Sequence, residues 1–241
     1  MKIILTEAQM KELSQIEEVR SFIGDTLNEE INFNVLKNKF KKLLMYGMSI
    51  GTIYAAINGY NNYTDKQNEL IEKARIAAEA ELEQERKNNL IAQKTESVKN
   101  YMDMALKNQG FTPDSTKLNP EALVIAAEKY NFDLPLLMAV AHLESCFGAT
   151  PRAQRTNSVF SVGSFDNGKN LAVYSHPDES VEGYIKLLNN DYLINGKTID
   201  DLLKPGCFIN KNGHRYASKK NYESLVKSIR NKIINNYPEL A

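Results

Sequence analysis

Residues 65–108 constrain the fold most, because this stretch contains no glycine and no proline. It is rich in Ala, Glu, Lys and Gln, which have high helix propensity. The pairs Glu69–Lys73 and Glu83–Lys87 have the favourable i,i+4 order. Apolar residues are too sparse for a continuous heptad seam. We therefore expect one long solvated helix over 65–111, either a stalk or a weak coiled coil through which chains could self-associate. A charged face without a partner is the better interpretation than a specific binding site.

The N-terminal part, residues 1–64, is predicted to be helical. Thr6 and Gln9 have the spacing of a capping box at a helix start. Apolar residues then recur at roughly helical spacing in two stretches, from Met10 to Val19 and from Phe33 to Leu43.

An uncharged segment, residues 43–60, follows a cluster of lysines at positions 37–42. As a helix it would measure about 27 Å, just short of a typical hydrocarbon core. Gly47 and Gly51 would let another helix approach closely. One interpretation is a short membrane anchor, with the N-terminus in the cytoplasm and the remainder outside. The other is a buried helix of a small helical domain or oligomer.

A cluster of Gly, Pro and small polar residues at 109–115 predicts a domain boundary at about residue 112, so that residues 112–241 form a separate domain. Asn119 and Asp133 are candidate caps of two helices that end near Tyr130 and Ser145. Alternating segments at 157–165 and 171–174, with an Asp-Asn-Gly turn between them, predict a small β-hairpin. Further helices are expected from about 178, from 199, and from Tyr222 to Ile234.

Glu144 ends a nearly continuous apolar run, residues 136–143. It lies in the last turn of its predicted helix, where the helix dipole disfavours another negative charge. Apolar neighbours disfavour ionisation further, so the pKa of Glu144 should be raised, as a general acid requires. On periodicity alone, a surface glutamate that merely ends a core helix is the favoured interpretation.

The residues after Glu144 favour the functional interpretation of this glutamate over the structural one. A helix ending in Glu, then a hairpin, then more helices is the layout of the lysozyme-like α+β fold. The motifs resemble those of the bacterial and phage endo-β-N-acetylglucosaminidases of the glucosaminidase family. The matching segments, in order, are Ala141-His142-Leu143-Glu144-Ser145-Cys146-Phe147-Gly148, Asn157-Ser158-Val159-Phe160-Ser161-Val162-Gly163, Phe165-Asp166-Asn167, Tyr174-Ser175-His176-Pro177-Asp178-Glu179-Ser180 and Tyr216-Ala217-Ser218-Lys219-Lys220-Asn221-Tyr222.

The resemblance covers residues 118–236 and departs from the family pattern in places. Phe147 stands where the family usually has Trp, and Cys146 and Ser161 stand where it has glycine. These departures affect the expected sugar contacts more than the expected reaction. The Gly-Leu-Met-Gln segment of lytic transglycosylases is absent, which favours a glucosaminidase.

The resemblance implies hydrolysis of β-1,4 bonds after N-acetylglucosamine in peptidoglycan, with Glu144 protonating the leaving oxygen. It also implies that Tyr216 lines the cleft as a catalytic residue. Asn157, Phe160 and Phe147 are the candidate substrate-binding residues, although for Phe160 a place in the core is the safer interpretation.

The second catalytic group is open. Asp166, on the predicted hairpin turn, is favoured by geometry, but a turn-forming role is at least as good an explanation for it. Asp178 and Glu179 are the next candidates, although both are well placed to cap a helix. Assistance from the acetamido group of the substrate would make a second carboxylate unnecessary.

The chain has 241 residues with 30 basic and 30 acidic side chains, so no basic field suggests nucleic acid. Its two cysteines form no metal or redox motif, and His-Glu-x-x-His is absent, so we expect neither a metal nor a cofactor. The expected location is either membrane-anchored, with the C-terminal domain outside the cytoplasm, or associated with a bacteriophage virion. The competing hypothesis is a virion or membrane protein whose lysozyme-like domain is structural or binds glycan without cleaving it.

Overall fold

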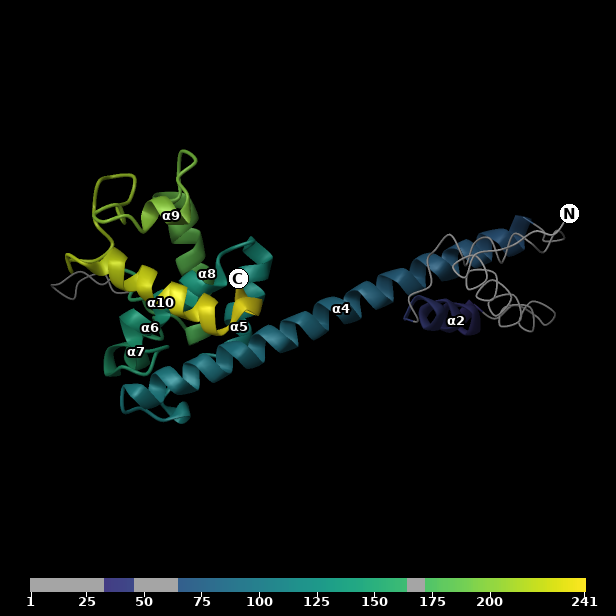
Figure 1. Cartoon of the computed structure of the whole chain (residues 1–241), viewed down its shortest axis with the longest axis horizontal. Helices are drawn as coiled ribbons and strands as arrows, with labels where there is room; N and C mark the ends of the chain where they lie inside the picture. The colour runs from purple at the N-terminus through teal and green to yellow at the C-terminus, as the bar shows by residue number, and fades with distance from the viewer. Residues whose placement is uncertain (1–32, 46–64, 164–171) are drawn as a thin grey trace, which may run out of the picture. The chain divides into compact units, whose positions relative to one another are not determined.

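The structure is a computed structural model that describes residues 33–45, 65–163 and 172–241 (Figure 1). The chain divides into two compact units, Met1–Asn89 and Leu90–Ala241. The described residues contain helices and no strand, which confirms the prediction of a mainly α protein.

The first unit contains helix α2 (Phe33–Met45) and the beginning of helix α4 (Asp65–Asn108). Ion pairs join the two helices, from Lys37 to Glu81 and from Lys41 to both Glu81 and Glu85. Because the higher-numbered lysine reaches the higher-numbered glutamate, α2 and α4 run in the same direction. Within this unit, the buried apolar residues of the two helices are Leu36, Phe40, Leu43, Ile71, Ala74 and Ala78.

The predicted anchor at 43–60 lies outside the described residues beyond Met45. Among the helices that are described, none combines the length and the apolar character needed to cross a membrane.

The single helix predicted over 65–111 is observed as α4, which ends at Asn108. Its last turns belong to the core of the second unit, where Val98, Tyr101, Met102 and Ala105 are buried. The hydroxyl of Tyr101 also hydrogen bonds to Nδ1 of His142 at 2.8 Å. The domain boundary predicted at about residue 112 therefore lies just after a helix end that is already part of the second core.

Two of the remaining helices begin where their capping residues predict. Helix α5 (Pro120–Tyr130) is capped by Asn119 and helix α6 (Leu134–Ser145) by Asp133, and in both the side chain accepts a backbone N–H. The others are α7 (Pro151–Thr156), α8 (Pro177–Leu187), a π-helical turn (Leu188–Tyr192), α9 (Ile199–Leu202) and α10 (Tyr222–Asn236). Short 3₁₀ turns occur at Pro113–Ser115 and Pro238–Leu240.

Helices α6 and α10 form the centre of the second unit (Figure 1). They run antiparallel, because Arg230 of α10 pairs with Asp133 at the start of α6, and Tyr222 of α10 lies by Glu144 at its end. Helix α6 is buried along almost its whole length, from Leu134 to Ala141. The apolar run that precedes Glu144 is thus the central element of the core.

The predicted β-hairpin is not observed in the described residues, and its turn, with Asp166, lies outside them. Asn157 and Ser161 have left-handed backbones (φ 53° and 52°), which interrupt an extended strand. Two backbone hydrogen bonds still connect the two segments, from Ala172 N to Val162 O and from Tyr174 N to Thr156 O. The two segments therefore lie close together, as the alternating pattern predicted, but no strand ladder is observed between their described residues.

Candidate active site

Glu144 lies in the last turn of α6, just before an unusual exit from the helix. The three residues that follow the helix, Cys146, Phe147 and Gly148, all have left-handed backbones, with φ of 47°, 58° and 89°. Such a conformation costs an L-residue about 1–2 kcal/mol. Cys146 and Ser161 stand where the family that the sequence resembles has glycine, and both have a positive φ. Because glycine adopts a positive φ without this cost, a side chain at each of these two positions lowers the stability of the folded chain.

The backbone of Val159 is held from two sides by buried serines. Its carbonyl accepts a hydrogen bond from Ser145 Oγ at 2.6 Å, and its N–H donates to Ser180 Oγ at 3.2 Å. Ser145 Oγ also accepts the N–H of Gly148 at 2.8 Å. These contacts fasten the segment that carries Ser161 to the end of α6, beside Glu144.

Glu144 is half-buried, and its burial raises the pKa of its carboxyl above the usual glutamate value. The hydroxyls of Tyr222 and Ser161 and the positive charge of Arg152 act in the opposite direction but do not cancel the effect of burial. A carboxyl with a raised pKa, still partly open to solvent, is suited to hold a proton near neutral pH and deliver it to a substrate.

Tyr216 lies within a cluster of aromatic rings next to Glu144. Its ring stacks on Phe208, with centroids 5.0 Å apart, and the rings of Tyr184, Tyr192 and Tyr222 have centroids 5.7–5.8 Å away. Its hydroxyl donates a hydrogen bond to the backbone carbonyl of Phe160. Burial, with the nearby hydroxyl of Tyr184 and the charge of Glu144, raises the pKa of Tyr216 well above its usual value. This residue therefore stays a neutral hydroxyl.

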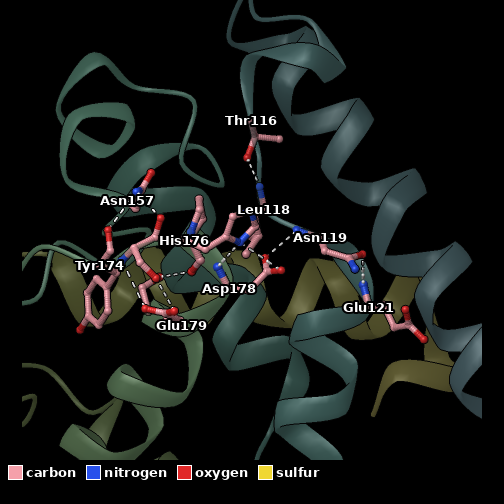
Figure 2. A network of polar contacts seen from close by, with 12 residues as sticks. Thr116, Leu118, Asn119, Glu121, Asn157, Tyr174, His176, Asp178 and Glu179 are labelled. Atoms are coloured by element: carbon pink, nitrogen blue, oxygen red, sulfur yellow. Dashed lines mark hydrogen bonds and ion pairs between the residues drawn. The ribbon is translucent and has the colours of Figure 1, made fainter.

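The three predicted substrate-binding residues occupy structural positions. Phe147 and Phe160 are fully buried, and Phe160 stacks on Tyr184 with ring centroids 4.3 Å apart. The Asn157 side chain donates hydrogen bonds to the carbonyls of Tyr174 and Ser175, at 2.9 and 3.1 Å (Figure 2). Contact of these residues with a sugar stays a prediction, and their placement favours support of the site over direct binding.

Asp178 and Glu179 are both engaged at the start of α8. Asp178 accepts the backbone N–H of Asn119 at 2.8 Å, and Glu179 accepts hydrogen bonds from Ser175, as the network in Figure 2 shows. These contacts fit the helix-start role that was the competing interpretation for both residues. Asp166, the favoured second carboxylate, lies outside the described residues.

A groove of about 780 Å³ lies between α5 and α8, and Glu144 is not among the residues that line it. Small and apolar residues, among them Ala122 and Ile125, form part of its lining. Most of its acidic groups are already paired. Glu182, for example, accepts hydrogen bonds from Lys129 and Tyr130. We place the candidate active site at Glu144 because the shifted pKa and the neutral tyrosine gather there.

The loop that carries Tyr216 is attached to α10 by a buried ion pair. Glu223, which is only 1% exposed, accepts two hydrogen bonds from the guanidinium of Arg215 at 2.9 and 3.0 Å. Burial alone would raise the pKa of Glu223, but backbone N–H groups, including that of Phe208, and the guanidinium outweigh it and lower the pKa. The pair thus holds the loop against the first turn of α10.

Replacing Glu223 with Gln should destabilise the second unit by about 2 kcal/mol, because Arg215 loses its buried partner but can turn to solvent. The denaturant midpoint at pH 7 measures this. Because the pKa of Glu223 is lowered by folding, the stabilisation is present above about pH 4.3, the ordinary glutamate value, and is lost as the pH falls through the lowered value. The difference in stability between the variant and the wild type should therefore become smaller in acid.

Lys186→Gln is the control variant. It breaks the exposed ion pair with Glu182 and should change stability by less than about 0.5 kcal/mol.

The site contains residues to which sequence reasoning gave no role. Tyr222 and Ser161 lie within the matched motifs, so the motifs could have indicated them. Tyr184 lies within the helix expected from about residue 178, and nothing in the sequence around Tyr184 or Arg152 connects either residue with Glu144. Only the folded arrangement of α6, α7, α8 and α10 brings these side chains to one place.

A comparison with models of known protein families gives a match within the second unit. Residues 120–237 match the model of the glucosaminidase family, which is described as mannosyl-glycoprotein endo-β-N-acetylglucosaminidase. The matched segment contains Glu144 and the helices around it, from α5 to α10. No curated protein and no solved structure matches the chain.

Proposed function

Because residues 120–237 form a domain of the glucosaminidase family, we propose that this protein hydrolyses the β-1,4 bond after N-acetylglucosamine in the glycan strands of peptidoglycan. The observation that carries the proposal is the half-buried Glu144, whose pKa burial raises, at the end of α6 and beside a cluster of neutral tyrosines. The family match supports the reaction class, which is that of a glycoside hydrolase.

In this proposal Glu144 is the general acid. Its carboxyl proton moves to the glycosidic oxygen as the bond from that oxygen to the anomeric carbon breaks, and the bonding electrons remain with the oxygen. The sugar develops oxocarbenium character, and water finally supplies the new hydroxyl at the anomeric carbon while its other proton passes to a carboxylate of the site. The group that supports the oxocarbenium ion or activates water is Asp166 or the acetamido group of the substrate, since Asp178 and Glu179 are held at the start of α8.

The substrate lies outside the cytoplasm, so the domain has to act there. A membrane anchor at 43–60, or incorporation into a virion, would bring it to the cell wall, and each remains a proposal. We also propose that chains self-associate through α4. The long polar stretch of α4 is compatible with it, because residues 83–90 are exposed.

Incubation of the full chain with purified peptidoglycan tests the proposed reaction. We expect new reducing ends that are N-acetylglucosamine, identified by borohydride reduction and mass spectrometry of the released fragments. The anomer that forms first, followed by NMR, separates retention from inversion. Reducing ends that are N-acetylmuramic acid, or wall binding with no new reducing ends, would contradict the proposal. The latter would favour a non-catalytic glycan-binding protein.

A further inference from the structure

The first residue of α10, Tyr222, lies beside the last turn of α6. Its ring packs against Tyr216 and Phe208, with centroids 5.7 and 5.6 Å away, and the side chain is only 3% exposed. The far end of the same helix pair is fixed by the contact between Asp133 and Arg230. Tyr222 is therefore held by the packing of its ring and not by its hydroxyl.

The hydroxyl of Tyr222 is buried and makes no hydrogen bond to any residue that the structure describes. A buried polar group without a partner costs free energy and calls for an explanation. The oxygen lies close enough to the Glu144 carboxyl for hydrogen bonding to lower the pKa of that group, although the two groups are not aligned as a formed hydrogen bond in this structure. The unused donor thus adjoins the residue whose charge changes in the proposed reaction.

The charged and titratable neighbours of Glu144 come from four elements. They are Arg152 of α7, Tyr184 of α8, Tyr216 of the loop before α10, and Tyr222 itself. The Tyr216 hydroxyl already donates to the Phe160 carbonyl. The Tyr184 hydroxyl is also buried without a partner, but it is not among the groups that lower the pKa of Glu144. Of the buried tyrosines in this set, Tyr222 alone combines a free hydroxyl with that effect.

We propose that Tyr222 is a positioning residue that donates a hydrogen bond to the Glu144 carboxylate as Glu144 gives up its proton. The proposal rests on the proposed function of Glu144. When the carboxyl proton moves to the leaving oxygen, the carboxylate gains an acceptor charge in a half-buried site, and the Tyr222 O–H turns toward it. No proton leaves Tyr222, because its pKa is raised well above the usual value by burial. The hydrogen bond stabilises the charged form and makes Glu144 a stronger acid.

The test replaces Tyr222 with Phe in the full chain, which removes only the hydroxyl. Without the donor, the pKa of Glu144 rises. The active form of a general acid is protonated, so the basic limb of the pH profile of kcat should move upward by about one pH unit. The kcat at the plateau should fall about tenfold, with little change in KM. The melting temperature should not decrease, because no hydrogen bond is lost from the folded state.

A second readout does not depend on activity. Carbon-13 NMR of glutamate side-chain carboxyls, with Glu144→Gln used to assign the signal, gives the pKa of Glu144 directly. It should be higher in Tyr222→Phe than in wild type. Tyr184→Phe is the matched control, since it also removes a buried hydroxyl without a partner, and the pKa of Glu144 should not move in it.

The outcomes distinguish this inference from the function on which it rests. An unshifted Glu144 titration in Tyr222→Phe overturns the role of Tyr222 even if the wild-type chain cleaves peptidoglycan. An equal shift in Tyr184→Phe overturns it as well. A wild-type chain that does not cleave peptidoglycan contradicts the proposed function, and the NMR titration still decides whether Tyr222 acts on Glu144.

Discussion

Replacement of Glu144 with Gln should lower kcat on peptidoglycan by about 10²- to 10⁴-fold, the range that general acid catalysis contributes. Glutamine has nearly the same shape and can still hydrogen bond, but it has no proton of suitable acidity to give to the leaving oxygen. KM should change little, because the interaction that is lost belongs to the transition state. The rate of release of reducing ends from purified walls, measured over a range of substrate concentrations, checks both values.

The same substitution has an opposite effect on stability. Because folding raises the pKa of Glu144, the ionised carboxyl destabilises the folded state. This destabilisation appears as the pH rises above the unfolded value of about 4.3 and increases up to the raised folded value. Glu144→Gln should therefore be at least as stable as wild type at pH 7. Glu96→Gln on the exposed face of α4 is the control and should keep wild-type activity. An active Glu144→Gln protein would refute the catalytic assignment.

Replacement of Asp133 with Ala should destabilise the second unit by about 3 kcal/mol, because Asp133 serves two functions. Its carboxylate accepts the N–H of Leu136 at 2.7 Å and so caps α6. It also accepts hydrogen bonds from the guanidinium of Arg230 on α10, two of them from Nε at 3.1 Å. Both side chains are mostly buried, so the variant would leave the guanidinium without its partner. The melting temperature should fall by roughly 6–12 °C.

Near-UV circular dichroism follows this transition, since most of the buried tyrosines belong to the second unit. Asp133→Asn is the matched comparison. Asparagine is also a good cap, so this variant should recover about 1 kcal/mol of the loss. In a double-mutant cycle with Arg230→Ala, the two substitutions should be less than additive. Strict additivity would show that the ion pair contributes nothing and that only the cap matters.

The helices of the second unit follow from local sequence signals. Asn119 and Asp133 are good caps before apolar runs, and the observed helices begin directly after them. The short helix α7 and the π-helical turn after α8 were not predicted, because Pro151–Thr156 and Leu188–Tyr192 are too short for a periodic pattern. The predicted hairpin is not observed in the described residues for a related reason. Alternation of apolar residues does not reveal that Asn157 and Ser161 adopt left-handed backbones.

For the candidate active site, sequence reasoning indicated Glu144 but not the residues that surround it. The raised pKa of Glu144 follows from its place at the end of an apolar helix, and the structure agrees in direction. The contacts of Tyr222 and Arg152 could not be predicted, because they depend on how α10 and α7 pack around α6. Phe147 and Phe160 show the converse difficulty. Apolar residues in a catalytic motif can serve the core, and only their complete burial reveals it.

The last turns of α4 decide where the chain can be divided. Composition places the boundary at the Gly- and Pro-rich stretch near residue 112, but a fragment that starts there would lack Val98, Tyr101 and Ala105, all of which are buried. Its core would lose the apolar side chains that α4 contributes, and His142 would lose the hydroxyl that hydrogen bonds to its ring. Such a fragment would expose apolar surface and tend to aggregate. A fragment that begins at Leu90 keeps these residues, so α4 supplies part of the core of the second unit as well as the polypeptide that leads to it.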